Sequence, residues 1–163
     1  MKHSIITILI FAMAVSNGTS ALAQEDKLLV VAGERVGVVS LGMTRAQVLE
    51  ARGSPTNIYQ EALGPMYRYA YGPQLDVRFT PIPDQLVNNL LTTDSGLATN
   101  LGIRIGSLGN DVTKVYGRDY KSRNSSLNTI NYVHLCYNDG IWFTLSTENI
   151  VLNMTVVPPN TCQ

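Results

Sequence analysis

Apolar and polar residues alternate along several short segments of the chain, which is the pattern of β-strands with one buried face. The six expected strands cover residues 67–71, 75–79, 86–92, 132–137, 141–145 and 150–157. Gly72-Pro73 separates the first two of these strands, and Asn138-Asp139-Gly140 separates the fourth and fifth. Both are turn sequences, so the pattern predicts antiparallel hairpins.

Two short helices are expected ahead of these strands. Thr44 and Gln47 have the spacing of a capping box, and Gly53 stands where a helix ends, so the first helix is predicted over 45–52. For the second helix, Ser107 is the expected cap and Gly117 the expected end. Two turns of helix are unstable alone in water, so each helix is expected to pack on an apolar surface.

The helix and strand patterns recur with an offset of 64 residues, which we interpret as an internal repeat without insertions. The recurring pairs are Leu41/Ile105, Gly42/Gly106, Val48/Val112, Gly53/Gly117, Val77/Ile141, Phe79/Phe143, Leu86/Ile150, Val87/Val151 and Leu90/Met154. The predicted division is a signal peptide over 1–23, a first unit over 24–99 and a second unit over 100–163, which together form one globular domain. The predicted fold class is α+β: two tandem helix-then-antiparallel-strands repeats share one sheet, with the helices on one face.

Alternation gives the predicted sheet two different faces. One face is apolar and is expected to lie under the helices, through Leu75, Val77, Phe79, Ile141, Phe143 and Leu145. The opposite, open face is the candidate binding surface, and its predicted residues are Trp142, Arg78, Tyr132, Asp76, Arg68, Thr144 and His134. If the first strand of each unit were shifted by one residue, the tyrosines of 67–71 would lie on the open face and Arg68 on the covered face.

The N-terminus has the pattern of a secretory signal. Lys2 precedes an apolar run over 5–15 that is too short to span a bilayer, and Ala21-Leu22-Ala23 is a cleavage site. An uncleaved anchor is the alternative. Cleavage predicts an exported protein, periplasmic or extracellular, with no transmembrane segment.

The only two cysteines, Cys136 and Cys162, both follow this signal. In an oxidising compartment such a pair predicts a disulfide. Free thiols or intermolecular pairing are the alternatives.

Charge argues against nucleic-acid binding. Without the signal and its Lys2 the chain has 11 basic and 12 acidic side chains, whereas nucleic-acid binding needs a strong positive field. Lys114, Arg118, Lys121 and Arg123 cluster, but Asp111 and Asp119 lie among them. We interpret the cluster as a solvated loop face, with an anion site as the alternative.

Reaction chemistry finds little support in the sequence. His134 with a serine and Asp76 or Asp139 is a formal Ser-His-Asp set, and Cys136 with His134 is a formal Cys-His set, but no serine has a nucleophile-elbow context. The chain has too few nitrogen and sulfur ligands for zinc and no calcium-loop pattern. We therefore expect no catalytic residue, no metal, no cofactor and no enzymatic activity.

The stretch from Leu41-Gly42-Met43-Thr44 through Val48 and Gly53 to Pro55 resembles the signature of the SmpA/OmlA (BamE-like) envelope proteins. The doubled pattern resembles the β-lactamase-inhibitory-protein family, whose repeats are of helix-then-sheet type. The resemblance implies a non-enzymatic protein-binding module. The chain departs from the outer-membrane assembly members because no lipid-bearing cysteine follows its apolar run.

These observations predict an exported protein-binding module, an enzyme inhibitor or envelope-assembly accessory, whose partner is another exported or envelope protein. The alternative is a binder of small ligands or cell-wall fragments on the same face. Trp142 has two interpretations: an interface anchor, since Trp, Tyr and Arg dominate interface energetics, or a residue covered by the C-terminal tail.

Overall fold

The structure, a computed structural model, describes residues 28–62, 64–70, 73–127 and 129–162, so the predicted signal peptide and Tyr71 lie outside the described residues. The elements in chain order are β1 (Leu29–Val31), β2 (Arg35–Val36), β3 (Val39–Ser40), α2 (Arg45–Arg52), β4 (Asn57–Glu61), β5 (Gly64–Tyr69), β6 (Leu75–Phe79), β7 (Val87–Thr92), β8 (Ala98–Thr99), α3 (Gly109–Tyr116), β9 (Tyr120–Leu127), β10 (Ile130–Tyr137), β11 (Ile141–Leu145) and β12 (Val151–Val156).

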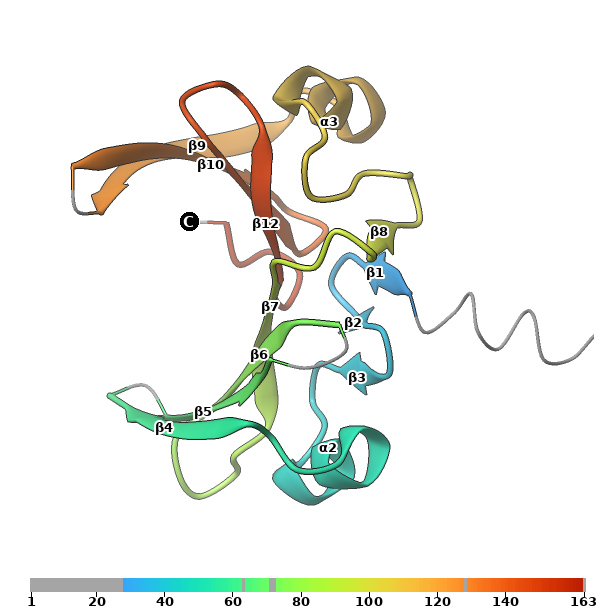
Figure 1. The fold of residues 1–163 in the computed structure, drawn as a ribbon, viewed down its shortest axis with the longest axis vertical. Coiled ribbons are helices and arrows are strands. Elements are labelled where there is room, and N and C mark those ends of the chain that lie inside the picture. The colour runs from blue at the N-terminus through green and yellow to red at the C-terminus, as the bar shows by residue number, and fades with distance from the viewer. Residues whose placement is uncertain (1–27, 63, 71–72, 128, 163) are drawn as a thin grey trace, which may run out of the picture.

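The strands form two sheets (Figure 1). The large sheet has eight antiparallel strands in the order β4-β5-β6-β7-β12-β11-β10-β9. Its two halves join where β7 pairs with β12. The small sheet has the order β3-β2-β1-β8, and in it β1 runs parallel to β8.

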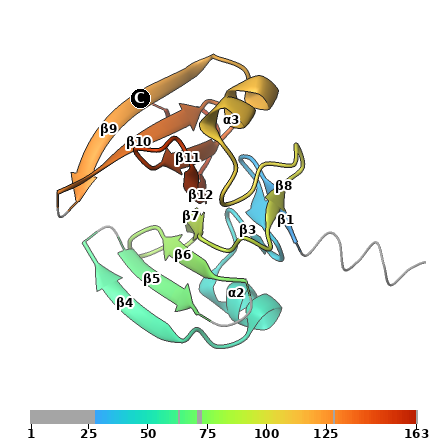
Figure 2. The same cartoon turned by 45° about the horizontal axis from the view of Figure 1, so that its top comes forward.

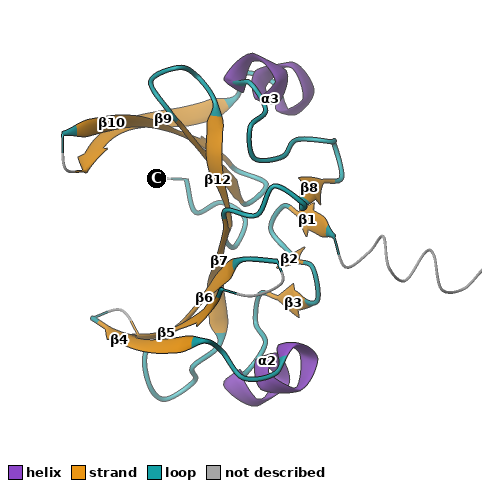
Figure 3. Ribbon diagram, viewed as in Figure 1, coloured by secondary structure: helices purple, strands orange, loops and turns teal. Residues whose placement is uncertain are grey.

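The large sheet curves so strongly that it encloses a concave side (Figure 3). The small sheet lies across the middle of the convex side, and α2 and α3 lie beyond its two ends (Figures 1 and 3). The core fills the space between these layers. Val30, Val36 and Val39 of the small sheet pack there with the apolar face of the large sheet, including Val77 and Phe143.

The capping box of α2 is confirmed. The Gln47 backbone N–H donates to Thr44 Oγ1 at 3.3 Å, and the Thr44 N–H donates to Gln47 Oε1 at 2.9 Å. Gly53 ends the helix with a φ of 80°, a conformation that favours glycine. Val48 is fully buried and anchors α2 to the core.

The predicted cap of the second helix is wrong. The N-cap of α3 is Leu108, which offers no side-chain hydrogen bond, and the Ser107 hydroxyl instead accepts from the Arg104 N–H at 3.1 Å. Gly109 lies against the Asn149 side chain, which would have to move to admit a Cβ, because a Cβ would lie 2.1 Å from Asn149 Oδ1. Gly117 ends the helix as predicted.

The fold-class prediction, α+β with two helix-then-strand repeats sharing one sheet and helices on one face, is wrong. The structure is 48% strand and 12% helix, and a second sheet rather than the helices covers the centre of the large one. The strands of the small sheet are only two or three residues long. Such short segments leave no hydrophobic period in the sequence, which is why the prediction missed this sheet.

The uninterrupted 64-residue offset is also wrong. In the first half, Asn57 pairs with Arg68, 11 residues later in the chain. In the second half, Lys121 pairs with Cys136, 15 residues later, so the β9–β10 hairpin is four residues longer than the β4–β5 hairpin. The β10–β11 and β11–β12 hairpins are each two residues shorter than the β5–β6 and β6–β7 hairpins. The 64-residue offset is therefore restored at β12. Phe79 therefore corresponds to Leu145, at the same bulge, rather than to Phe143.

Candidate functional site: the concave face

The concave face of the large sheet is the side that points away from the core. Strand register and burial assign to it Asn57, Tyr59 and Glu61 of β4, Met66 and Arg68 of β5, Asp76 and Arg78 of β6, Asn89 and Leu91 of β7, Asn153 and Thr155 of β12, Trp142 and Thr144 of β11, Tyr132, His134 and Cys136 of β10, and Lys121, Arg123 and Ser125 of β9. All seven predicted binding residues lie on this face. Their role in binding stays a prediction.

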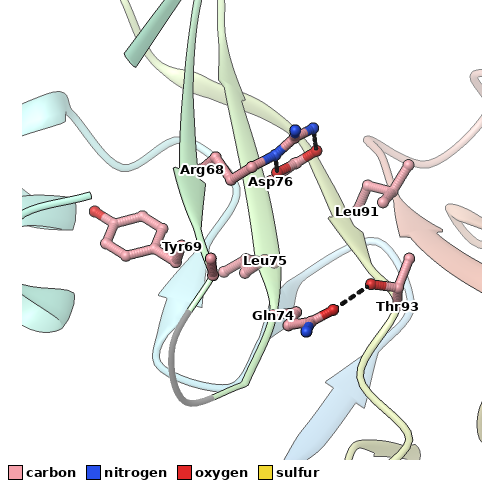
Figure 4. Close-up of a pocket in the computed structure, with 8 residues that line it drawn as sticks. Arg68, Tyr69, Gln74, Leu75, Asp76, Leu91 and Thr93 are labelled. Carbon is pink, nitrogen blue, oxygen red and sulfur yellow. Dashed lines mark hydrogen bonds and ion pairs between the residues drawn. The ribbon is translucent and has the colours of Figure 1, made fainter. Parts of the chain in front are cut away.

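In the half formed by β4–β7, charged side chains pair with one another. Arg68 donates two hydrogen bonds to Asp76 directly across the strand pair, at 2.8 and 2.7 Å (Figure 4). Its guanidinium also lies 5.2 Å from the centre of the Tyr59 ring. The hydrogen bonds that Arg68 donates to Asp76, and the negative charge of that carboxylate, raise the pKa of Arg68 above its ordinary value, so this arginine stays charged.

A second ion pair in this half joins Arg78 to Glu61 at 2.9 Å. Arg68 and Arg78 are each matched by a carboxylate, so this half of the face has little unbalanced charge. A cavity of about 390 Å³ lies beside the first pair. Figure 4 shows the lining residues Leu91, Gln74 and Thr93, with Thr93 Oγ1 donating to Gln74 Oε1 at 2.9 Å.

In the half formed by β9–β12, His134 is held between two hydroxyl groups. Its Nε2 lies 2.6 Å from Ser125 Oγ, and its Nδ1 lies 3.0 Å from Thr144 Oγ1. Burial, followed by the nearby charge of Arg123, lowers the pKa of His134 below its ordinary value. The imidazole is therefore neutral at pH 7.

This arrangement differs from the Ser-His-Asp set that the sequence allows. Asp76 is bound to Arg68 in the other half, and Asp139 lies in the turn between β10 and β11. Within the described part of the chain, no carboxylate is hydrogen-bonded to His134, so a threonine hydroxyl takes the place that orients the imidazole in a triad. Cys136 is bound in a disulfide, which excludes the Cys-His alternative.

The predicted disulfide between Cys136 and Cys162 is confirmed. It brings the last described residue of the chain onto the concave side, where Figure 1 places the C-terminal end. Trp142 pairs with Cys136 across β10 and β11 and is half-buried. The tail end therefore borders Trp142 without covering it completely.

A cavity of about 390 Å³ opens beside this disulfide. Its lining residues are Lys121, Ser122, Arg123, Ser125, His134, Cys136, Trp142 and Cys162. We call it the tryptophan pocket. None of these lining residues is acidic, and among the described residues no ion pair or hydrogen bond engages the side chains of Lys121 or Arg123.

The sequence interpretation placed Lys121 and Arg123 in a solvated loop face together with Lys114 and Arg118. The structure corrects this. Lys121 and Arg123 lie on β9, whose eight residues are all exposed or half-buried. An edge strand of this kind shows no apolar alternation, so the hydrophobic pattern missed β9, and it missed the exposed β4 for the same reason. The i, i+2 spacing of Lys121, Arg123 and Ser125 was the signal from which a strand with these residues on one face could have been predicted.

Several buried polar atoms of this face have no hydrogen-bond partner within the described protein. They are Trp142 Nε1 and the amide oxygens of Asn89 and Asn153. Asn89 lies on β7 and Asn153 on β12, the two strands at the middle of the sheet. Native proteins leave few buried polar groups unpaired, so each of these three atoms needs a partner outside the described protein, either an ordered water or a bound molecule.

Within the described residues, no group of three or more His, Cys, Asp and Glu side chains is arranged to hold a metal ion. No described helix combines the length and apolar character needed to cross a membrane.

No protein-family profile matches the chain, and no curated protein matches it in sequence. The fold is similar to that of several solved structures. A DUF4309 family protein from Bacillus subtilis has a TM-score of 0.55 at 15% identity, over 77% of this chain and 88% of that chain. An uncharacterized protein from Escherichia coli has a TM-score of 0.52 at 11% identity, over 78% of this chain and 98% of that chain.

The fold is also similar to an extracellular protein containing a SCP domain from Bacillus anthracis, with a TM-score of 0.52 at 11% identity. The match covers 96% of this chain and 51% of that chain, so the chain spans about half the length of that protein. Identities this low show a shared fold alone. None of these three proteins is described as BamE-like or as a β-lactamase inhibitor, and the resemblance to those families stays a prediction.

Proposed function

We propose that this protein is an exported, non-enzymatic binding module that holds a partner protein on its concave face. The observation that carries the proposal is the set of buried, unpaired polar atoms of Asn89, Asn153 and Trp142 along the centre of that face. A partner segment lying across β7, β12 and β11 would supply the missing hydrogen bonds. Interfaces that satisfy buried polar groups gain specificity, because a mismatched partner leaves these groups unpaired.

The side chains around this centre support protein binding. Trp142 and Tyr132 offer large, partly exposed aromatic surfaces, and Arg68 and Arg78 lie on the opposite half. Aromatic residues and arginine are the side chains that most often anchor protein interfaces. The curvature of the sheet adds contact area on both sides of a bound segment (Figure 2).

Export to the periplasm or the medium is part of the proposal. It is supported by the signal-like N-terminus and by the disulfide, since disulfides persist in oxidising compartments. Two proteins of similar fold are described as extracellular or secretory, one from Bacillus anthracis and one, a cysteine-rich secretory protein, from Staphylococcus aureus.

Site-specific photo-cross-linking in the native host tests the proposal. A photoreactive residue at Leu91, in the centre of the face and outside the set of unpaired groups, is expected to capture a protein in one-to-one stoichiometry. The same residue at Glu50, exposed on α2, is the positional control and should capture none. Trp142→Ala should abolish capture while folding is retained, and Leu49→Ala, which removes an exposed apolar side chain from α2, should not. Equal capture from both positions, or capture unaffected by Trp142→Ala, would contradict the proposal.

A further inference from the structure

The tryptophan pocket combines two chemistries that no other part of the concave face brings together. One wall is apolar and consists of the Trp142 ring and the Cys136–Cys162 disulfide. The other wall comes from β9 and carries Lys121, Arg123 and the Ser125 hydroxyl. A ligand that fits both walls has an apolar group joined to an anionic one.

The charge of the pocket selects an anion. Lys121 and Arg123 have no acidic partner among the described residues, whereas Arg68 and Arg78 of the other half are both neutralised. His134 contributes no charge at pH 7 because its pKa is lowered. Two cations at the mouth of a partly apolar pocket favour a carboxylate, to which arginine can donate two parallel hydrogen bonds.

The position of β9 favours a peptide as the source of this carboxylate. β9 is an edge strand of the large sheet, so its outer backbone N–H and C=O groups face no other strand of the described structure. An extended chain can pair with such an edge while its end enters an adjacent pocket. A free carboxylic acid would gain nothing from the strand edge.

We propose that the tryptophan pocket binds the C-terminal end of a peptide: the last side chain, which is apolar, packs on Trp142 and the disulfide, and the terminal carboxylate binds Arg123 and Lys121. This inference rests on the proposed binding function and specifies how the C-terminal end of the partner is held at β9, apart from the segment at the centre of the face. The residues before the C-terminus pair with the edge of β9.

Trp142 makes the proposal directly measurable, because it is the only tryptophan of the chain and lines the pocket. Its fluorescence is followed while the disulfide-bonded protein is titrated with the tripeptide N-acetyl-Leu-Val-Phe. The same peptide with an amidated C-terminus removes the negative charge. N-acetyl-phenylalanine removes the two preceding residues, and with them the backbone that would pair with β9.

We expect saturable binding of the acid peptide and affinity lower by about tenfold or more for the amide, which is the usual size of a lost hydrogen bond to a charged group. N-acetyl-phenylalanine should bind more weakly than the acid peptide. Arg123→Gln should weaken binding of the acid peptide by about tenfold and leave binding of the amide unchanged. Arg104→Gln, which removes an exposed arginine outside the concave face, is the matched control.

Equal affinity for acid and amide, or a loss in Arg123→Gln that is the same for both peptides, would overturn the carboxylate site. Equal affinity for the acid peptide and N-acetyl-phenylalanine would overturn the peptide as ligand and indicate a free carboxylic acid. Failure of the acid peptide to bind would contradict this inference but not the proposed function. Cross-linking from Leu91 that depends on Trp142 would then still support the proposed function.

Discussion

The two halves of the large sheet place different chemistry at equivalent positions. Arg68 and Asp76 are a cross-strand pair in the first half, and Cys136 and Trp142 are the corresponding pair in the second. The first pair is an ion pair that balances itself. The second pair ties down the C-terminal tail and forms one wall of a pocket.

The edges of the two halves differ in the same way. Tyr59 of β4 lies against Arg68, and its counterpart Arg123 of β9 is a cation without an acidic partner among the described residues. Similar backbone geometry therefore supports a charge-balanced surface in one half and a cationic one in the other. The two halves thus differ in charge: the first half pairs its arginines with carboxylates, and the second half carries, beside the tryptophan pocket, cations that no described carboxylate pairs with.

The largest expected effect comes from removing the disulfide, which the first half lacks. Replacing Cys136 and Cys162 together by serine should lower the free energy of unfolding by about 3–4 kcal/mol, because the bond restrains an unfolded segment of 26 residues. Denaturant unfolding measures the change. Trp142 fluorescence of the folded variant should also shift to the red as the tail leaves. Unchanged stability and unchanged fluorescence would show that the C-terminal tail stays on the concave face without the disulfide.

A smaller effect tests whether the halves fold together. Val48 of α2 and Val112 of α3 are equivalent and fully buried, so each substitution to alanine should cost about 2 kcal/mol. Because β7 and β12 join the halves in one sheet, both variants should show a single unfolding transition at lower denaturant concentration. Two separate transitions in either variant would contradict this cooperativity.

The smallest expected effect concerns protonation of His134. Its pKa in the folded protein lies below the ordinary 6.5, so protonation favours the unfolded chain. The contribution of His134 to stability is complete above pH 6.5 and is lost as the pH falls through its lowered pKa. Arg123→Gln should raise this pKa, and Arg78→Gln in the other half should not change it. Titration of the His134 ring protons by NMR measures both, and equal pKa values in the two variants would refute the role of Arg123.

The candidate site was predictable only in part. Alternation assigned Trp142, Arg78 and His134 to one face, and the strand registers agree with that assignment. The sequence did not place Ser125 and Arg123 on this face, because an edge strand exposed on both faces carries no hydrophobic signal. It also had no means of matching Arg68 with Asp76, since cross-strand pairing depends on hairpin register.

The sequence by itself determined the first helix with its cap, the order of the hairpins, and which strand residues face the core and which face away from it. These depend on local hydrogen bonds and on a two-residue period, and the length differences between the halves are all even, so they leave the period intact. Tertiary structure decided the second sheet, the curvature and the pocket. Each arises where segments far apart in the chain meet, as β1 meets β8, and no local pattern records such a meeting.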